Sequence, residues 1–367
     1  MLAWPLLVAT TAPAPDGFVA GVGGQPRALE TALADARAVG FNAVRIFLRW
    51  DKIETTDGTP DWTCRYLTDA DIGPDTDGDG TPDPWPGIPC EAGPCGCGYS
   101  ADERVQLVAR GAAPPAVMLT LVGTPAWARG QPAAGCPAEA PPRALPLRRG
   151  KETTFARFAA AVATRYGDVA YAFELWNEPD LAACVSWAGT RQQYKTQILP
   201  AAAAVKATGM RPALVVAPTL ENPSGDALDA WMDWSRPVDV VSFNLYTVDL
   251  PRALAKIEEM NAWCRANPRC PGFYITEFGA RRRGVSTCPG PRADAPGAAD
   301  VAIMRRCRNR RRCAGFFHFP LSDQERRPEC TRGLLDVHGC RKRRLCTIAT
   351  RFFKVGTLPF PCVGCGP

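Results

Sequence analysis

Two glutamates each stand at the end of a short, β-rich run of residues. Glu178 lies in the stretch Phe-Glu-Leu-Trp-Asn-Glu-Pro (173–179), and Glu277 lies in Tyr-Ile-Thr-Glu-Phe-Gly (274–279). Proline cannot donate to a sheet ladder, so Pro179 stops the first strand there. Two carboxylates that face each other across a cleft suit glycoside cleavage, because one protonates the leaving oxygen while the other stabilises or attacks the anomeric carbon. We therefore expect Glu178 and Glu277 to be a catalytic pair.

This chemistry requires opposite protonation states at the two positions. In a retaining pair the carboxyl groups lie about 5–5.5 Å apart, and the nucleophile forms a covalent glycosyl-enzyme intermediate. Glu277 must be ionised to attack, and a neighbouring arginine and the Tyr246 hydroxyl would favour its charge. That charge would raise the pKa of Glu178 and keep it protonated for acid catalysis. Once Glu277 carries the sugar its charge is lost, and Glu178 can act as the base.

Eight β-rich runs with helical patterns between most of them predict the scaffold that holds this pair. The helical pattern is clear at 151–166, where Phe155, Phe158, Val162 and Tyr166 form one stripe. The β-rich runs are 18–22, 44–50, 116–122, 172–177, 214–218, 240–246, 273–277 and 315–321. Eight alternating strands favour an α/β fold of the closed (β/α)8 TIM-barrel type over an open doubly wound sheet.

Two insertions interrupt this plan. Residues 55–99 follow strand 2 and are rich in cysteine, and residues 128–147 follow strand 3 and are rich in proline and alanine. Both leave the carboxyl ends of strands, the face where barrel active sites lie, so each is either a cleft wall or a decorated loop. We expect the barrel over 16–350 and a Cys-containing tail over 351–367. Residues 1–15 resemble a truncated signal peptide that lacks the basic segment.

The chain resembles clan A of the glycoside hydrolases and is most similar to glycoside hydrolase family 39 and cellulase-like relatives. The motifs are GFNAVRIFLRWDKIE, TLVGTPAWA, RYGDVAYAFELWNEPD, DVVSFNLY, YITEFG and GLLDVHGCRK, which span about residues 18–345. The resemblance implies a retaining hydrolase that cleaves O-glycosidic bonds and needs no cofactor for catalysis. It implies Glu178, after strand 4, as acid/base, and Glu277, at the end of strand 7, as nucleophile.

The resemblance also implies substrate contacts around the pair. Asn177 would hydrogen-bond the sugar 2-hydroxyl, Tyr246 would hydrogen-bond the nucleophile, and Arg45 would lie beneath the catalytic floor. Trp127 occupies the Pro-x-Trp position after strand 3. Together with Trp176 it would limit the access of water to the cleft.

Two positions depart from the family pattern. Asn244 stands where strand 6 usually carries a histidine, and on strand 8 an aromatic run that includes His318 replaces a tryptophan. An aromatic or imidazole ring can still stack on sugar, so we expect His318 to contact substrate. We expect Asn244 to contact substrate as well. These departures bear on the identity of the sugar more than on the reaction type. Glu174 shares strand parity with Glu178, and we expect it to point into the barrel as a partner for Arg45.

An acidic loop in the first insertion has the spacing of a calcium site. Its candidate ligands are Asp75, Asp77, Asp79, Thr81 and Asp83. The acidic residues occupy positions 1, 3, 5 and 9, with Gly80 at position 6, which matches the start of a calcium loop. Position 12 is Pro86 rather than a glutamate, so the pattern resembles the shorter repeats of thrombospondin type 3 and dockerin modules. A solvated acidic turn explains the same residues, and any calcium would be structural.

The cysteine content indicates an oxidising compartment. Sixteen cysteines, an even number, suit disulfides in a secreted, extracellular or periplasmic protein. Zinc at Cys362 and Cys365, or at Cys95 and Cys97, would need a second cysteine pair or a nearby histidine to complete four ligands. Apolar runs stay shorter than the roughly 18 residues of a membrane helix, so we expect no membrane span.

The net charge of +6 is concentrated in one part of the chain. Residues 281–312 contain ten arginines and two aspartates, without stacking aromatics or a nucleic-acid motif. We expect no nucleic-acid partner and a solvated loop, with uronate polymers as an alternative ligand. The expected substrate is an oligo- or polysaccharide; linkage, endo or exo action and oligomeric state stay open. Alternatives to a hydrolase are a non-catalytic carbohydrate-binding barrel and a calcium-dependent adhesion or matrix protein.

Overall fold

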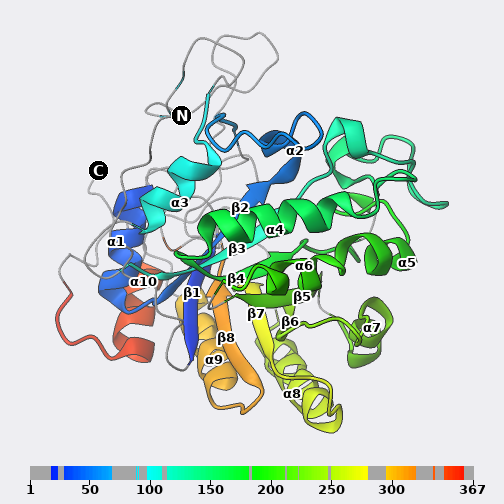
Figure 1. The fold of residues 1–367 in the computed structure, drawn as a ribbon. Coiled ribbons are helices and arrows are strands. Elements are labelled where there is room, and N and C mark those ends of the chain that lie inside the picture. The colour runs from blue at the N-terminus through cyan, green and yellow to red at the C-terminus, as the bar shows by residue number, and fades with distance from the viewer. Residues whose placement is uncertain are drawn as a thin grey trace.

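The protein folds around a closed barrel of eight parallel strands that pair in chain order (Figure 1). The strands are β1 (Val19–Gly23), β2 (Ala43–Arg49), β3 (Ala116–Val122), β4 (Ala170–Leu175), β5 (Leu214–Glu221), β6 (Val240–Leu245), β7 (Phe273–Phe278) and β8 (Cys313–His318). The computed structural model describes residues 18–23, 29–67, 88, 90, 97–109, 114–181, 184–210, 213–221, 223–246, 249–279, 295–319, 334 and 343–358. The predicted (β/α)8 barrel is confirmed.

Helices surround the strands on the outside of the barrel. The main ones are α1 (Leu29–Val39), α3 (Ala101–Ala109), α4 (Thr154–Tyr166), α6 (Ala201–Ala207), α7 (Gly225–Trp231), α8 (Leu250–Ala266), α9 (Ala295–Arg308) and α10 (Arg343–Ile348). Shorter turns are α2 (Trp50–Ile53), α5 (Arg191–Gln193), η1 (Ala126–Ala128), η2 (Pro142–Ala144), η4 (Tyr194–Ile198) and η5 (Ala349–Phe353). Within the described ranges, none of the helices combines the length and the apolar character that a membrane crossing requires.

Some predicted boundaries differ from the structure for local reasons. The fourth strand runs over Ala170–Leu175 rather than 172–177, because the chain leaves the sheet at Trp176, which has φ of +74°. The helical segment between β4 and β5 is divided, with a π turn (Tyr194–Ile198) ending before Pro200 and α6 beginning after it. Proline has no N–H to continue a helical ladder, which favours a break at this point.

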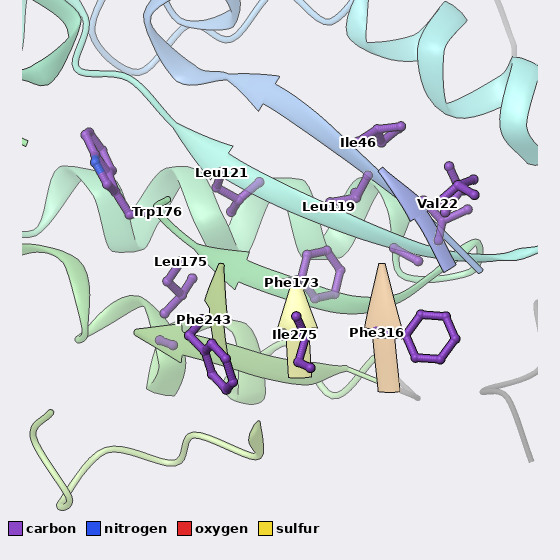
Figure 2. Packing of buried hydrophobic residues seen from close by; sticks show 14 of the residues in the cluster. Val22, Ile46, Leu119, Leu121, Phe173, Leu175, Trp176, Phe243, Ile275 and Phe316 are labelled. Atoms are coloured by element: carbon purple, nitrogen blue, oxygen red, sulfur yellow. The ribbon is translucent and has the colours of Figure 1, made fainter. Parts of the chain in front are cut away.

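The barrel has separate outer and inner apolar layers. Outward-facing strand residues such as Leu119, Phe243 and Phe316 are buried against the helices (Figure 2). An inner cluster fills the barrel with Val19, Ala43, Ala116, Met118, Tyr171, Ala172, Val216, Val240, Tyr274 and Phe317. Gly21 makes room for the Phe317 ring, since a Cβ there would lie 2.3 Å from a ring carbon. The apolar plug keeps polar groups toward the carboxyl ends of the strands.

The predicted disulfides are present and close or connect loops. Described pairs are Cys90–Cys97, Cys136–Cys184, Cys264–Cys270 and Cys307–Cys313. Cys97 is therefore bonded to another cysteine and is not a zinc ligand. No group of three or more possible metal ligands occurs in the described ranges. The predicted calcium loop at 75–83, the leader at 1–15 and Cys362 with Cys365 lie outside those ranges.

Candidate active site

The backbone after β4 places Glu178 at the mouth of the barrel. Trp176 and Glu178 both adopt left-handed conformations, with φ of +74° and +46°. A left-handed backbone costs a residue with a Cβ roughly 1–2 kcal/mol, so neighbouring strands have to hold this turn. The Trp176 amide donates to the Leu121 carbonyl of β3 at 3.0 Å, and the Glu178 amide donates to the Thr219 carbonyl of β5 at 2.8 Å. Glu178 is thus anchored to both flanking strands.

Glu277 lies near the carboxyl end of β7 and is bound on both oxygens. Arg45 Nη1 donates to Oε1 at 2.5 Å, and the Tyr246 hydroxyl donates to Oε2 at 2.5 Å. Glu277 is buried, with 4 % of its surface exposed. A charge-assisted ion pair and a phenolic donor therefore hold both oxygens of the Glu277 carboxyl group in place. The sequence-based expectation for Tyr246 matches this geometry.

Arg45 joins several groups of the site with one guanidinium. Its Nε donates to Glu174 Oε2 at 2.7 Å, and its Nη2 donates to Asn177 Oδ1 at 2.8 Å. Arg45 and Glu174 are fully buried. Burial lowers the pKa of Arg45, but the carboxylates of Glu174 and Glu277 outweigh it and raise that pKa overall. Arg45 therefore stays charged beside Glu277.

A polar ring beneath the site fixes Glu174. The Thr120 hydroxyl donates to Oε2 at 2.5 Å, and the Thr219 hydroxyl donates to Oε1 at 2.7 Å. The Thr219 oxygen also lies 2.6 Å from the Ser242 hydroxyl. These hydroxyls come from β3, β5 and β6, so Glu174 links four neighbouring strands. Glu174 points inward as expected and is the predicted partner of Arg45.

Asn244 connects Glu178 to the rest of the site. Its Nδ2 donates to Glu178 Oε1 at 2.8 Å and lies 3.3 Å from Asn177 Oδ1. The Thr276 hydroxyl donates to Asn244 Oδ1 at 3.0 Å, which fixes the amide orientation. The residue that departs from the family pattern on strand 6 thus supplies an N–H donor to Glu178. Glu277, Arg45, Asn177, Asn244 and Glu178 form one continuous hydrogen-bonded chain.

The two carboxyl groups have different electrostatic surroundings. Burial and then the negative charge of Glu277 raise the pKa of Glu178 to about 8, against the opposing effect of the Asn244 hydrogen bond. The nearby Glu221 adds to this increase. Burial also raises the pKa of Asp180 to about 6. Glu178 is therefore largely protonated at neutral pH, as a general acid must be.

Two residues predicted to contact substrate lie elsewhere. The Trp176 ring packs outside the barrel against Phe155 and Trp187, with 1 % of its surface exposed (Figure 2). The left-handed turn at Trp176 interrupts the alternation of inward and outward side chains along the strand, so the Trp176 ring lies outside the barrel. His318 also faces outward: it is buried, and its Nε2 lies 3.3 Å from Asp300 Oδ2 on α9. We correct both predictions.

Trp127 follows β3 as expected and is partly exposed. Its indole N–H donates to the Glu54 carbonyl at 2.7 Å, and its ring packs edge-on against Trp50. The Lys151 ammonium and the Arg157 guanidinium lie 5.4 and 5.8 Å from the ring centre. These contacts orient the ring by cation–π attraction. Its stacking on sugar stays a prediction.

Some residues around the site were not singled out from the sequence. Phe47 follows Arg45 by two residues and is partly exposed. The Arg45 guanidinium carbon lies 4.5 Å from the centre of the Phe47 ring. Phe319 follows His318, is partly exposed and lies against Gly23 at the end of β1. Inward strand parity with Arg45 could have identified Phe47, and parity with the inward Phe317 could have identified Phe319.

A disulfide holds the loop after β4 to the predicted second insertion. Cys136 is bonded to Cys184, and the Ser186 hydroxyl donates to the Asn177 carbonyl. The Trp176 indole donates to the Ser186 carbonyl at 2.9 Å. This insertion therefore supports the segment that carries Glu178, and the pairing of its cysteine was not predictable from the cysteine positions.

Comparison with solved structures supports the fold. An exo-β-1,4-mannosidase from Opitutaceae bacterium strain TAV5 superposes with a TM-score of 0.60 at 17 % identity, over 93 % of this chain and 60 % of its own. A glycoside hydrolase family 39 β-xylosidase from Caulobacter crescentus gives a TM-score of 0.58 at 16 % identity, over 94 % and 72 %. A family 5 subfamily 18 protein from Streptomyces cattleya, solved with Manβ1-4GlcNAc, gives 0.58 at 15 % identity, over 94 % and 83 %.

These matches confirm the barrel expected from the resemblance to clan A. The chain spans 60 % of the length of the mannosidase it matches. No protein-family model and no curated protein matches the chain. At 15–17 % identity these superpositions establish the fold alone.

Proposed function

We propose that the protein is a secreted retaining glycoside hydrolase, with Glu178 as acid/base and Glu277 as nucleophile. The observation that carries this proposal is the difference between the two carboxyl groups. Arg45 and Tyr246 bind both oxygens of Glu277, whereas burial and the charge of Glu277 raise the pKa of Glu178 to about 8. Glu277 is thus bound by a cation and a phenolic donor, whereas Glu178 is arranged as a carboxylic acid.

In the first step Glu277 Oε attacks the anomeric carbon while Glu178 transfers its proton to the glycosidic oxygen. The C–O bond to the leaving group breaks, and a glycosyl ester forms on Glu277. Asn177, held by Arg45 and Asn244, is positioned to hydrogen-bond the sugar 2-hydroxyl. Such a contact strengthens in the oxocarbenium-like transition state.

In the second step water cleaves the ester. Esterification removes the negative charge of Glu277, so the pKa of Glu178 falls and its carboxylate accepts a proton from water. The Tyr246 hydroxyl and Arg45 are placed to stabilise the Glu277 carboxylate as it leaves the sugar. The products are a hemiacetal with retained configuration and the regenerated pair.

The substrate class is a β-linked oligosaccharide or polysaccharide. This part of the proposal draws on the similar barrels, whose descriptions name a β-1,4-mannosidase and a β-xylosidase. Phe47 and Phe319 offer partly exposed rings for stacking at the mouth. A panel of aryl β-mannosides, β-xylosides and β-glucosides would identify the sugar.

Proton NMR of the first-formed product tests the mechanism. Retained configuration is expected, and an inverted product would refute the two-step route. A 2-fluoroglycoside of the preferred sugar should label Glu277 in the intact protein. Glu277→Ala should bind substrate without turnover, and full activity in this variant would exclude Glu277 as the nucleophile. An inactive parent that binds sugar would favour a non-catalytic barrel.

A further inference from the structure

Two neighbouring loops at the amino ends of β7 and β8 carry a concentration of arginine. The loops, 264–270 and 307–313, have the sequences CRANPRC and CRNRRRC, with six arginines and no acidic residue. Each is closed by a disulfide between its first and last residues. Both loops join a helix, α8 or α9, to the following strand (Figure 1).

The loops form one surface because their strands and side chains are joined. Phe273 pairs with Cys313 in the sheet, and the Phe273 amide donates to the Arg312 carbonyl at 2.8 Å. Arg312 Nη1 lies 3.4 Å from the Cys270 carbonyl and 3.3 Å from the Pro271 carbonyl. Arg312 thus connects one disulfide loop to the other, and the two disulfides limit loop motion.

Most of the positive charge on these loops is available to solvent. Arg265, Arg269, Arg308 and Arg311 are exposed. Among the described residues, Glu258 pairs with Arg310 of the second loop and with Arg306, just before that loop.

The nearby carboxylate of Asp229 is engaged by other donors. Its Oδ1 accepts from Trp234 Nε1 at 2.9 Å and lies 3.3 Å from Asn267 Nδ2. The surface formed by the two loops therefore keeps a positive excess.

This surface lies apart from the catalytic pair. Phe273 begins β7, and Glu277 is four residues further along the same strand. At about 3.3 Å per residue the two positions are roughly 13 Å apart, on opposite ends of the barrel. The loop arginines of the 281–312 run therefore lie too far from Glu277 to contact a uronate at the cleavage site.

We infer that the two disulfide-closed loops form a second binding surface for an acidic polysaccharide, with sugar carboxylates or sulfates as the recognised groups. Guanidinium forks match both anions with paired hydrogen bonds. In the described ranges Val185, outside these loops, is the large hydrophobic residue that is exposed. The two loops contain no aromatic residue, and the partly exposed Trp234 beside them carries the Arg269 guanidinium, whose carbon lies 5.2 Å from the ring centre. The loops therefore present cations rather than stacking rings or exposed apolar side chains. The inference is independent of the proposed hydrolase activity.

Binding of the full-length protein to immobilised polygalacturonate and dextran sulfate tests this inference, with neutral dextran as the blank. The test variant combines Arg265→Gln, Arg269→Gln and Arg311→Gln, and leaves the loop-joining Arg312 intact. The control combines Arg149→Gln, Arg191→Gln and Arg252→Gln, which are exposed elsewhere. Each triple variant lowers the net charge from +6 by three, to +3.

The parent and the control should bind at least one acidic polymer, and the polymer bound identifies carboxylate or sulfate as the ligand. The test variant should bind at least about fivefold more weakly, since three exposed ion pairs contribute a few tenths of a kcal/mol each. Melting curves that match the parent would show that the variant is folded. Equal weakening in both variants, no binding by the parent, or equal affinity for single-stranded DNA would overturn the inference.

Discussion

Replacing Asn244 by leucine should move the alkaline limit of activity upward. Asn244 donates to Glu178 Oε1 at 2.8 Å, and this hydrogen bond opposes the increase in the pKa of Glu178. A hydrogen bond to a charged group contributes about 1.5–3 kcal/mol, against about 0.5–1.5 kcal/mol for a neutral one. Removing Asn244 therefore costs the ionised form of Glu178 about 1 kcal/mol more stabilisation than its protonated form. This difference corresponds to an increase of about 0.7 in the pKa of Glu178.

The sign follows from the role of Glu178 as an acid. In the parent, with the pKa of Glu178 at about 8, activity falls as pH rises through that value because the acid loses its proton. At pH 9 about a tenth of the parent molecules keep this proton, against about a third of the variant molecules. The ratio of kcat/KM at pH 9 to that at pH 7 should increase roughly threefold to fourfold, although absolute activity falls as Asn177 loses a contact.

Profiles of kcat/KM against pH, measured with an aryl glycoside, give this ratio directly. Ser242→Ala is the matched control, because Ser242 is buried in the same polar layer and contacts Thr219 rather than Glu178. It should leave the alkaline limit in place. An unchanged or lower limit in Asn244→Leu would refute the assignment of Glu178 as the acid or of Asn244 as its donor.

Other perturbations probe different parts of the protein. Arg45→Lys should lower kcat/KM by about 10²–10³, because an ammonium cannot replace the planar fork that joins Glu174 and Glu277; near-parent kinetics would contradict this. Glu178→Gln should slow aryl glycosides with poor leaving groups by about 10²–10⁴ and spare dinitrophenyl glycosides; equal losses for both would reject an acid role. If residues 75–83 bind calcium, chelation should lower Tm by a few degrees, reversibly and without changing the initial rate at 25 °C, since saturation at a hundred times Kd stabilises by about 2.7 kcal/mol; an unchanged Tm would indicate a solvated turn.

The sequence was sufficient for the barrel because its signals are local. Hydrophobic runs alternate with helical stripes, and the register of a closed parallel barrel brings the strand ends to one face. Glu178 and Glu277 could be named because both end such runs, and Arg45 could be paired with Glu174 from strand parity. Parity fails at Trp176, because no residue-type signal marks a left-handed turn at a tryptophan.

Other features depend on contacts between distant segments. The sequence alone does not determine whether His318 faces the cleft or the outer layer. Because Phe317 fills the barrel interior, His318 points outward and faces α9. The pairing of Cys136 with Cys184 is one of many combinations that sixteen cysteines allow. The loop conformations that bring them together are set by tertiary packing.

The rigid guanidinium of Arg45 also fixes distances within the site. Its nitrogens are fixed in one plane by resonance, and they contact Glu174, Glu277 and Asn177. The bond lengths and angles of the guanidinium therefore set the spacing between Glu277, the proposed nucleophile, and Asn177, the proposed partner of the 2-hydroxyl. When the barrel fluctuates, the three side chains bound to Arg45 should move together, and the distances between them should change little.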